Sequence, residues 1–343
     1  MESAIPLHLR TERSRQRRVP DDYVPPYPSF VARHNPSVKR VVMAYFGLQY
    51  RGALPNAASQ ALAELDTAFG EGAAPGHWDR ASYLDEAGYT NVISTAYWDS
   101  PGRFDNWFAE FGAAWTADLH ASSGVGRFTE VLRPAVERYE TLFSAPDRAE
   151  GMAVLAEGMS DIVQEHAYWG GARDRIPLSQ TDALAPNGAP LLERVGRRLR
   201  IQPQHGLCLI RSGQDWSDTD DDERRMYLED VEPVLRKGME FLRDDGLAIG
   251  CYSNRFMTVL DGQGKPIEKS FGMSWWKSLA ALERWAESHP THVAIFGAAM
   301  QYLSKLGPAA RLKLYHEVTV AAAEEQFFEY LDCHDRTGML SAL

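Results

Sequence analysis

The stretch YTNVISTAYW, at residues 89–98, sets the expectation for the fold of this chain. Its β-branched and aromatic residues predict a buried strand. Ser100 and Pro101 follow at once, and such a pair is typical of the start of a helix. The same spacing of aromatic residues occurs twice in the chain, in Tyr97, Trp98 and Trp107 and again in Trp275, Trp276 and Trp285. The repeat indicates that one strand-to-helix unit is used twice.

Other segments fit two copies of this unit. The strand signals lie at residues 41–50, 125–142, 207–212 and 246–260, and the helix signals lie at residues 57–69, with Asn56 as the cap, and 218–242. We predict an α+β fold in which duplicated ferredoxin-like modules form a β-barrel-like core covered by helices, of the dimeric α+β barrel type. The modules would span about residues 38–145 and 205–343, within a single domain at residues 38–343.

Residues 1–37 are predicted to form an extended N-terminal arm, because several prolines near its end restrict the backbone. Five arginines cluster in this arm: Arg10, Arg13, Arg15, Arg17 and Arg18. Acidic residues interrupt and follow the cluster, so we interpret it as a solvated tail or a clasp on a second subunit. The net charge of −11 argues against nucleic acid and acidic membranes as partners.

The composition excludes several classes of protein. The chain has 343 residues, of which 44% are hydrophobic and 24% charged, so it can bury a sizeable core. No apolar run approaches the roughly 18 to 20 residues of a membrane-spanning helix, and we expect a cytoplasmic protein. The three cysteines, Cys208, Cys251 and Cys333, are widely spaced and predict buried thiols. The usual motifs of dinucleotide-binding, P-loop, serine-hydrolase and zincin enzymes are absent.

Two histidines stand out by their surroundings. His292 follows Pro290, which favours a helix start, and apolar residues then recur along that helix: Val293, Ile295, Phe296, Met300 and Leu303. Such a wall suits either core packing or a flat porphyrin. His316 lies in LKLYHEV, where strand alternation places it on one face with Leu314 and Val318. This ring is either a buried structural histidine or a general acid and base in a dry pocket.

Five segments together resemble the aldoxime dehydratase family. They are YWGGARDR at residues 168–175, RSGQDW at 211–216, GCYSNRF at 250–256, SHPTH at 288–292 and LYHE at 314–317. The resemblance runs from the opening MESAI to residues 333–340, and leaves about residues 50–80 and 184–204 unmatched.

The resemblance implies a haem-dependent lyase that converts an aldoxime, R–CH=N–OH, to a nitrile and water, usually as a homodimer. It implies haem b as the cofactor, ferrous in the active state, with the oxime nitrogen bound to the iron. The second histidine of SHPTH, His292, corresponds to the proximal iron ligand, and His289 to a structural neighbour.

The same resemblance assigns the distal side of the site. His316 corresponds to the general acid and base, and Ser212 to the residue that bonds the oxime hydroxyl. The supporting arginine and glutamate fall on Arg175 and Glu140, with Arg173 and Glu137 as nearby alternatives. A histidine suits the role because imidazole changes its protonation near neutral pH, so one ring can give a proton to the leaving oxygen and take one from carbon.

Two other functions fit the same residues. A peroxidase-like or chlorite-dismutase-like haem protein of this fold would also use a proximal histidine. A non-enzymatic binder of haem or of another small ligand would keep His292 and His316 as core residues.

Overall fold

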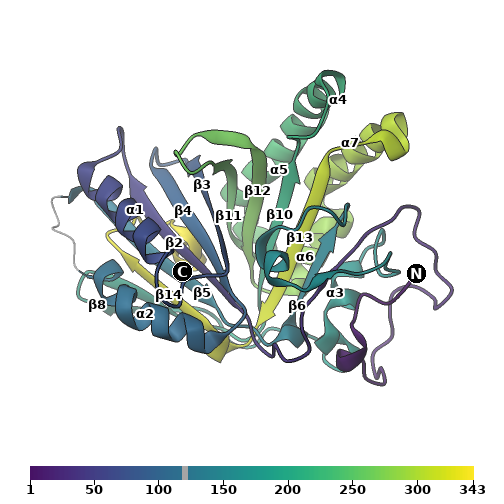
Figure 1. Ribbon diagram of the computed structural model, residues 1–343, viewed down its shortest axis with the longest axis horizontal. Helices are drawn as coiled ribbons and strands as arrows, with labels where there is room; N and C mark the ends of the chain where they lie inside the picture. The colour runs from purple at the N-terminus through teal and green to yellow at the C-terminus, as the bar shows by residue number, and fades with distance from the viewer. Residues whose placement is uncertain (118–122) are drawn as a thin grey trace.

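The computed structural model describes residues 1–117 and 123–343, which form an α+β protein around one large antiparallel sheet (Figure 1). The first half contributes four strands: β2 (Val42–Tyr50), β3 (His77–Leu84), β4 (Thr90–Trp98) and β5 (Val125–Leu132). Its helices are α1 (Asn56–Ala68), between β2 and β3, and α2 (Pro101–Trp115), between β4 and β5. In the sheet the four strands lie in the order β5-β2-β4-β3.

The second half repeats this order. Its strands are β10 (Leu207–Asp215), β11 (Cys251–Leu260), β12 (Pro266–Trp276) and β13 (Lys313–Ala321), and they lie in the order β13-β10-β12-β11. Between β10 and β11 come α4 (Asp221–Met226), a π-helical turn (Tyr227–Val231) and α5 (Glu232–Asp244). Between β12 and β13 come α6 (Leu279–Ser288) and α7 (Pro290–Leu306). Both halves therefore have the same order of elements and of strands.

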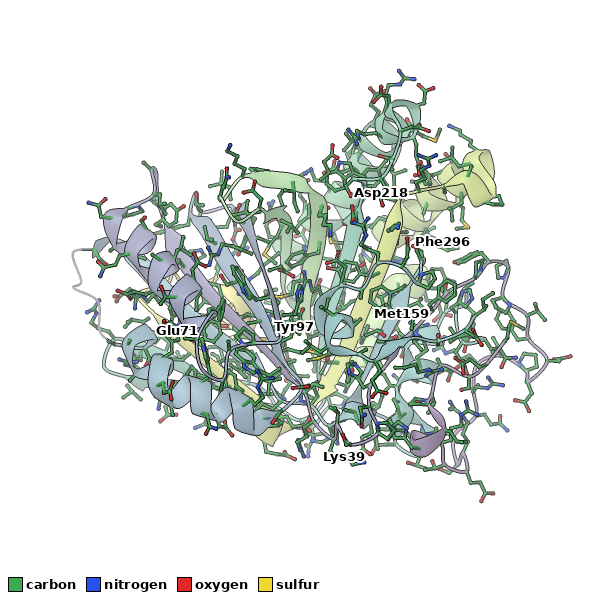
Figure 2. The ribbon with its side chains drawn as sticks, in the orientation of Figure 1. Lys39, Glu71, Tyr97, Met159, Asp218 and Phe296 are labelled. Atoms are coloured by element: carbon green, nitrogen blue, oxygen red, sulfur yellow. The ribbon has the colours of Figure 1, made fainter. Side chains whose placement is uncertain are left out.

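The two halves are joined in three places. β3 pairs with β11, while β6 (Tyr139–Phe143) follows the first half but pairs with β13 of the second. Conversely β14 (Gln326–Leu331) pairs with β5, and β9 (Arg198–Gln202) and β8 (Leu191–Val195) extend the sheet beyond it. The inner faces also meet, because the Tyr97 hydroxyl donates to Oε1 of Glu317 at 2.6 Å (Tyr97 is labelled in Figure 2).

Burial explains why apolar and polar residues do not alternate along β2. Its residues alternate between two cores: Met43 and Tyr45 point into the interior between the two half-sheets, whereas Phe46 packs under α1 and α2. The ring centroid of Phe46 lies 5.3 Å from that of Trp107. A strand covered on both faces has no polar side, so period-two alternation disappears.

Several expected boundaries differ from the structure. Residues 246–249 form a 3₁₀ turn, so the strand expected from residue 246 begins at Cys251. The helix expected at residues 218–242 is divided by the π-helical turn, and Asn56 is the first residue of α1 rather than its cap. β3 was not predicted, because most of its residues are only half-buried and their pattern carries little signal.

The N-terminal arm is irregular and packs on its own chain. Its short strand β1 (Ala32–Arg33) pairs with β7 (Gly158–Met159). The interpretation of its arginines as a solvated tail or subunit clasp is wrong for Arg13 and Arg17, which contact Asp174 and Glu165 of the same chain. Buried carboxylates need such partners, and these acids lie too far along the chain for the sequence to reveal them. In the described residues no helix is both long and apolar enough to cross a membrane.

Two buried histidines, one in the arm and one outside it, predict a loss of stability in mild acid. Burial lowers the pKa of His34 and of His166 to about 4, with Arg175 adding to the effect at His166. The unfolded chain binds these protons near pH 6.5, so the free energy of unfolding decreases as the pH falls from about 6.5 towards 4. Urea unfolding between pH 7 and 5 should show this slope, and His34→Phe should reduce it. His8→Phe, at an exposed histidine, should not, and equal slopes in both variants would contradict the assignment.

Candidate active site

Three neighbouring strands present polar side chains on one face of the sheet. Ser212 of β10 lies directly opposite His316 of β13, and directly opposed residues of antiparallel strands point to the same side. Glu140 of β6 lies opposite Val318, two residues beyond His316, and therefore shares that face. The Ser212 hydroxyl makes no hydrogen bond within the described part of the chain, which leaves it able to bond a ligand.

Arg175, at the end of the short helix α3 (Gly171–Arg175), completes this cluster. Its Nε donates to Oε2 of Glu140 at 2.6 Å, and its Nη2 donates to Oε1 at 3.1 Å. Its Nη1 donates to the backbone oxygen of Glu165 at 2.6 Å. Both Arg175 and Glu140 are buried, and a bidentate pair of this kind holds its geometry firmly. The positive charge of Arg175, followed by that of His316, outweighs desolvation and lowers the pKa of Glu140.

His316 has two partners at one ring nitrogen. Nε2 lies 2.8 Å from Nη2 of Arg175 and 3.2 Å from Oε1 of Glu140. A guanidinium can only donate and a carboxylate can only accept, so Nε2 has a partner whether or not it carries a proton. Within the chain itself the side chain of His316 is 26% exposed, and that of Leu314 on the same face is 38% exposed.

The structure separates the alternatives that the sequence left open. Arg173 points away from the cluster and forms an ion pair with Glu283, at 2.7 Å from Nη2. Glu137 is exposed, on the 3₁₀ turn before β6. Arg175 and Glu140 are therefore the members of the two pairs that contact His316.

His292 lies in the first turn of α7. Pro290 occupies the first helical position, and His289 caps the helix by accepting a hydrogen bond from the backbone nitrogen of Thr291. The ring of His292 lies 5.6 Å from Trp169 and 4.6 Å from Trp285, measured between centroids. Burial lowers the pKa of His292, opposed by the backbone of Ala286, so its imidazole is neutral, as an iron ligand must be.

The residues around His292 fit a haem group. Among the described residues its buried Nδ1 has no hydrogen-bond partner of normal geometry, which leaves the ring free to be oriented by a ligand bond. A haem supplies the other ligands of its iron from the macrocycle, so a single histidine suffices to hold it. Phe296, one turn further along α7, is 41% exposed and provides apolar surface (Figure 2).

The opposite face of the same strands carries a buried polar network that the sequence did not reveal. Arg211 of β10 donates to the Tyr97 hydroxyl and, at 2.6 Å, to Asp79. Glu317 accepts from Tyr97 and from the backbone nitrogen of Met152, and burial raises its pKa. The only signal in the sequence was an acid and an arginine at strand positions where apolar residues are expected. This network ties the two half-sheets together behind the site.

A cavity of about 50 Å³ lies behind Glu140 and Arg175, beneath the N-terminal arm. Both ring nitrogens of His34 and the hydroxyl of Tyr139, which also line it, are buried without a partner among the described residues. Space of this size accommodates a few water molecules, which would satisfy these groups. The sequence gave no sign of this cavity, because His34 is a single histidine in an irregular segment.

The fold and this arrangement define a class of protein: an α+β protein with a histidine among aromatic side chains and a cluster of histidine, arginine and glutamate built on a sheet. Comparison with known proteins agrees, because the family described as haem-containing dehydratase matches residues 44–339. The chain belongs to the haem-containing dehydratase family, and its full-length relatives include aldoxime dehydratases.

Relatives and solved structures match almost end to end. The aliphatic aldoxime dehydratase of Pseudomonas chlororaphis is 41% identical over 350 residues, covering 99% of this chain and 98% of the relative. The phenylacetaldoxime dehydratase of Bacillus sp. (strain OxB-1) is 32% identical over 333 residues, covering 94% of each. A crystal structure of aldoxime dehydratase has a TM-score of 0.95 at 41% identity, covering 100% and 99% of the two chains. Another, in complex with butyraldoxime, has a TM-score of 0.95 at 40% identity, covering 100% and 96%. These matches favour a dehydratase over a peroxidase-like protein or a non-enzymatic binder.

Proposed function

We propose that this protein dehydrates aldoximes to nitriles and water, with the proton carried by His316. The contact of one ring nitrogen with both Arg175 and Glu140 supports this proposal, because it fixes the ring and leaves the other nitrogen, Nδ1, for the substrate. The full-length similarity to aldoxime dehydratases, one of them solved with butyraldoxime, supports aldoximes as the substrates.

Haem b, held by His292 in the ferrous state, would supply an iron with an open position that binds the oxime nitrogen and donates electron density towards it. His292 is suited to hold it because burial favours the neutral ring, which lies beside Trp169 and Trp285, and Phe296 packs on Trp169. His289 remains the cap of α7 and stacks on Phe241 at 4.3 Å between centroids.

His316 moves one proton from carbon to oxygen. Nε2 is occupied by its contacts with Arg175 and Glu140, so Nδ1 would be the nitrogen that exchanges its proton with the substrate, with Nε2–H donating to Glu140 during these steps. The protonated ring gives the Nδ1 proton to the oxime oxygen, the N–O bond breaks and water leaves. The neutral ring then accepts the proton from the aldoxime carbon as the C≡N bond forms. The ring ends as it began, so R–CH=N–OH gives R–C≡N and H₂O in balance.

Ser212, Arg175 and Glu140 prepare the ring and the substrate for these steps. The Ser212 hydroxyl, opposite His316 on the next strand, donates to or accepts from the oxime hydroxyl and orients it. Arg175 clamps Glu140 through two hydrogen bonds, which keeps the carboxylate aligned with Nε2. Each of these residues acts by holding the ring or the substrate in position.

The function is tested with reduced, haem-loaded protein under anaerobic conditions. We expect butyraldoxime to shift the Soret band saturably and butyronitrile to accumulate, as measured by gas chromatography. A haem protein that shows neither a spectral shift nor nitrile with butyraldoxime or phenylacetaldoxime would contradict the proposal.

Ser212→Ala should keep its haem and lose turnover by about 10²-fold, the scale of one oriented hydrogen bond lost from a transition state. The change removes only a hydroxyl on a half-buried strand residue, so the fold should persist. Nitrile formation and the oxime-induced Soret shift would be measured together. Ser59→Ala, on the exposed side of α1, is the control, and equal kcat in both variants would remove Ser212 from the site.

We also infer that the two halves are tandem ferredoxin-like modules, and that residues 1–37 and 38–343 are an arm and a single domain. The equal strand orders β5-β2-β4-β3 and β13-β10-β12-β11 support this duplication. By its resemblance to the family we expect a cytoplasmic homodimer, which light scattering at micromolar concentration would test.

A further inference from the structure

We infer that the N-terminal arm is a strap that positions Arg175, and that Arg17 and Glu165 are positioning residues of the site. This inference rests on the proposed role of Arg175 beside His316. It starts from the observation that α3 is only five residues long, which is too short to fix its own orientation. Something outside the helix must therefore hold Arg175 in place.

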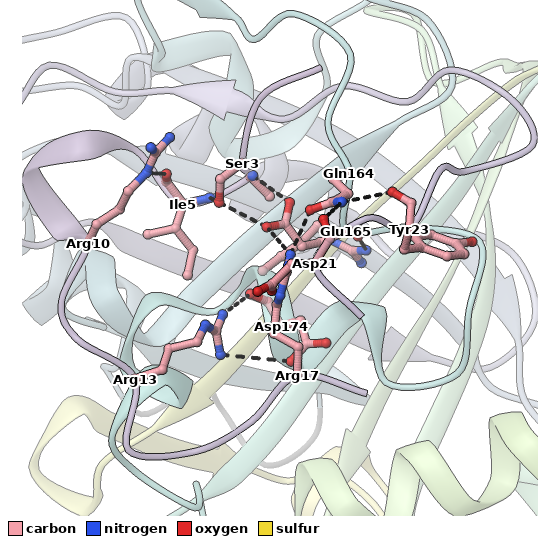
Figure 3. A network of polar contacts seen from close by, with 12 residues as sticks. Ser3, Ile5, Arg10, Arg13, Arg17, Asp21, Tyr23, Gln164, Glu165 and Asp174 are labelled. Carbon is pink, nitrogen blue, oxygen red and sulfur yellow. Dashed lines mark hydrogen bonds and ion pairs between the residues drawn. The ribbon is translucent and has the colours of Figure 1, made fainter. Parts of the chain in front are cut away.

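The first contact of the arm is with the segment before α3. Glu165 is 2% exposed, and its Oε2 accepts from the backbone nitrogen of Ala4 at 2.7 Å. Its Oε1 accepts from Ser3 at 2.9 Å and from Nη1 of Arg17 at 3.3 Å, as Figure 3 shows. The backbone oxygen of the same residue accepts the 2.6 Å hydrogen bond from Arg175. The arm therefore fixes Glu165, and the backbone of Glu165 binds Arg175.

The second contact is with α3 itself. Arg13 donates from Nη2 to the backbone oxygen of Asp174, the residue before Arg175, at 3.2 Å (Figure 3). The backbone nitrogen of Arg18 donates to the carboxylate of Asp174 at 3.3 Å. Arg18 also packs on Gly170, whose φ of +98° favours glycine and whose missing side chain leaves room for this close approach.

The third contact is with the segment after α3. Gln180 accepts from the backbone nitrogen of Thr11 at 3.0 Å and donates to the backbone oxygen of Leu9 at 2.8 Å. Residues before, within and after α3 are therefore all bonded to residues 2–18. Because Glu165 and Asp174 are buried, losing their partners would leave buried charge uncompensated, and the segment would shift to find water.

The test is a double-mutant cycle between the arm and Arg175. In the wild-type background, Arg17→Met removes a cation from Glu165 while keeping an unbranched apolar stem, and kcat should fall about tenfold through misplacement of Arg175, with KM and the haem spectrum unchanged. In the Arg175→Ala background the same change should have no further effect on kcat, because its target is gone. Arg17→Lys should restore most of the lost kcat. Arg15→Met, at an exposed arginine of the arm, is the matched control.

Hydrogen exchange of the full-length protein gives a reading that does not depend on turnover. Arg17→Met and Glu165→Gln should each speed exchange of the backbone amides at residues 164–176, and Arg15→Met should not. Equal falls in kcat in both backgrounds, or an unchanged kcat in Arg17→Met, would overturn the strap. Full activity of Arg175→Ala alone would instead overturn the proposed role of Arg175, so the two failures can be told apart.

Discussion

His316→Ala is expected to keep its haem and to bind aldoxime, yet to form nitrile about 10³-fold more slowly than the wild type. Both proton steps of the proposed reaction pass through this ring, and the residue contacts the distal cluster rather than α7. Neither of the two residues that contact His316 is suited to replace it. Arg175 is a permanent cation, and Glu140 is engaged by Arg175 through both carboxylate oxygens. Single-turnover nitrile formation by reduced protein, with a spectral titration of butyraldoxime, measures the two properties separately.

The outcomes of this experiment are distinct. A normal Soret shift with little nitrile locates the loss in the proton transfers. A loss of less than about tenfold in His316→Ala would lie below the range of general acid–base catalysis. Such a result would show that His316 is not the acid–base group. His289→Ala, in another histidine that the site does not use for proton transfer, should keep wild-type turnover.

His292→Ala is expected to lose stoichiometric haem and, with it, all measurable dehydration. The change removes the imidazole that would bind the iron and leaves a space beside the apolar rings of Trp169 and Trp285, neither of which is an iron ligand. The haem content of purified protein, from the pyridine haemochrome and the Soret absorbance per chain, is the measurement.

His289→Ala provides the matched control, three residues away in the same motif. It removes the cap of α7 and should lower the free energy of unfolding by about 1 kcal/mol while leaving the haem content unchanged. Exogenous imidazole should restore some haem binding to His292→Ala, because it can enter the space left by the side chain. Full haem content in His292→Ala, or its loss in His289→Ala alone, would show that the axial ligand is another residue.

Much of the sheet could be predicted because burial leaves a direct mark on sequence. β2 and β4 appear as runs rich in β-branched and aromatic residues, and β10 begins with the apolar run LCLI, since both faces of these strands are covered. β3 left no such mark, because its half-buried residues are mixed in character. The pairing of β6 with β13 was also invisible, because it joins segments more than 170 residues apart and depends on how the halves pack.

The sequence by itself determined the α+β class, the strand-to-helix repeat, the helix start at Pro290 and the motifs that indicate the family, since each depends on residues close together in the chain. Only the tertiary structure showed that Arg175 and Glu140 contact His316, whereas Arg173 pairs with Glu283, because neighbours in sequence point in different directions once a helix or strand forms. The packing of the arm on its own chain was likewise visible only in the tertiary structure. In the sequence, the arginines of the arm resemble a solvated tail. In the folded chain, Arg13 and Arg17 form ion pairs with Asp174 and Glu165. A buried carboxylate needs a cation or a hydrogen-bond donor, and that partner can lie anywhere in the chain.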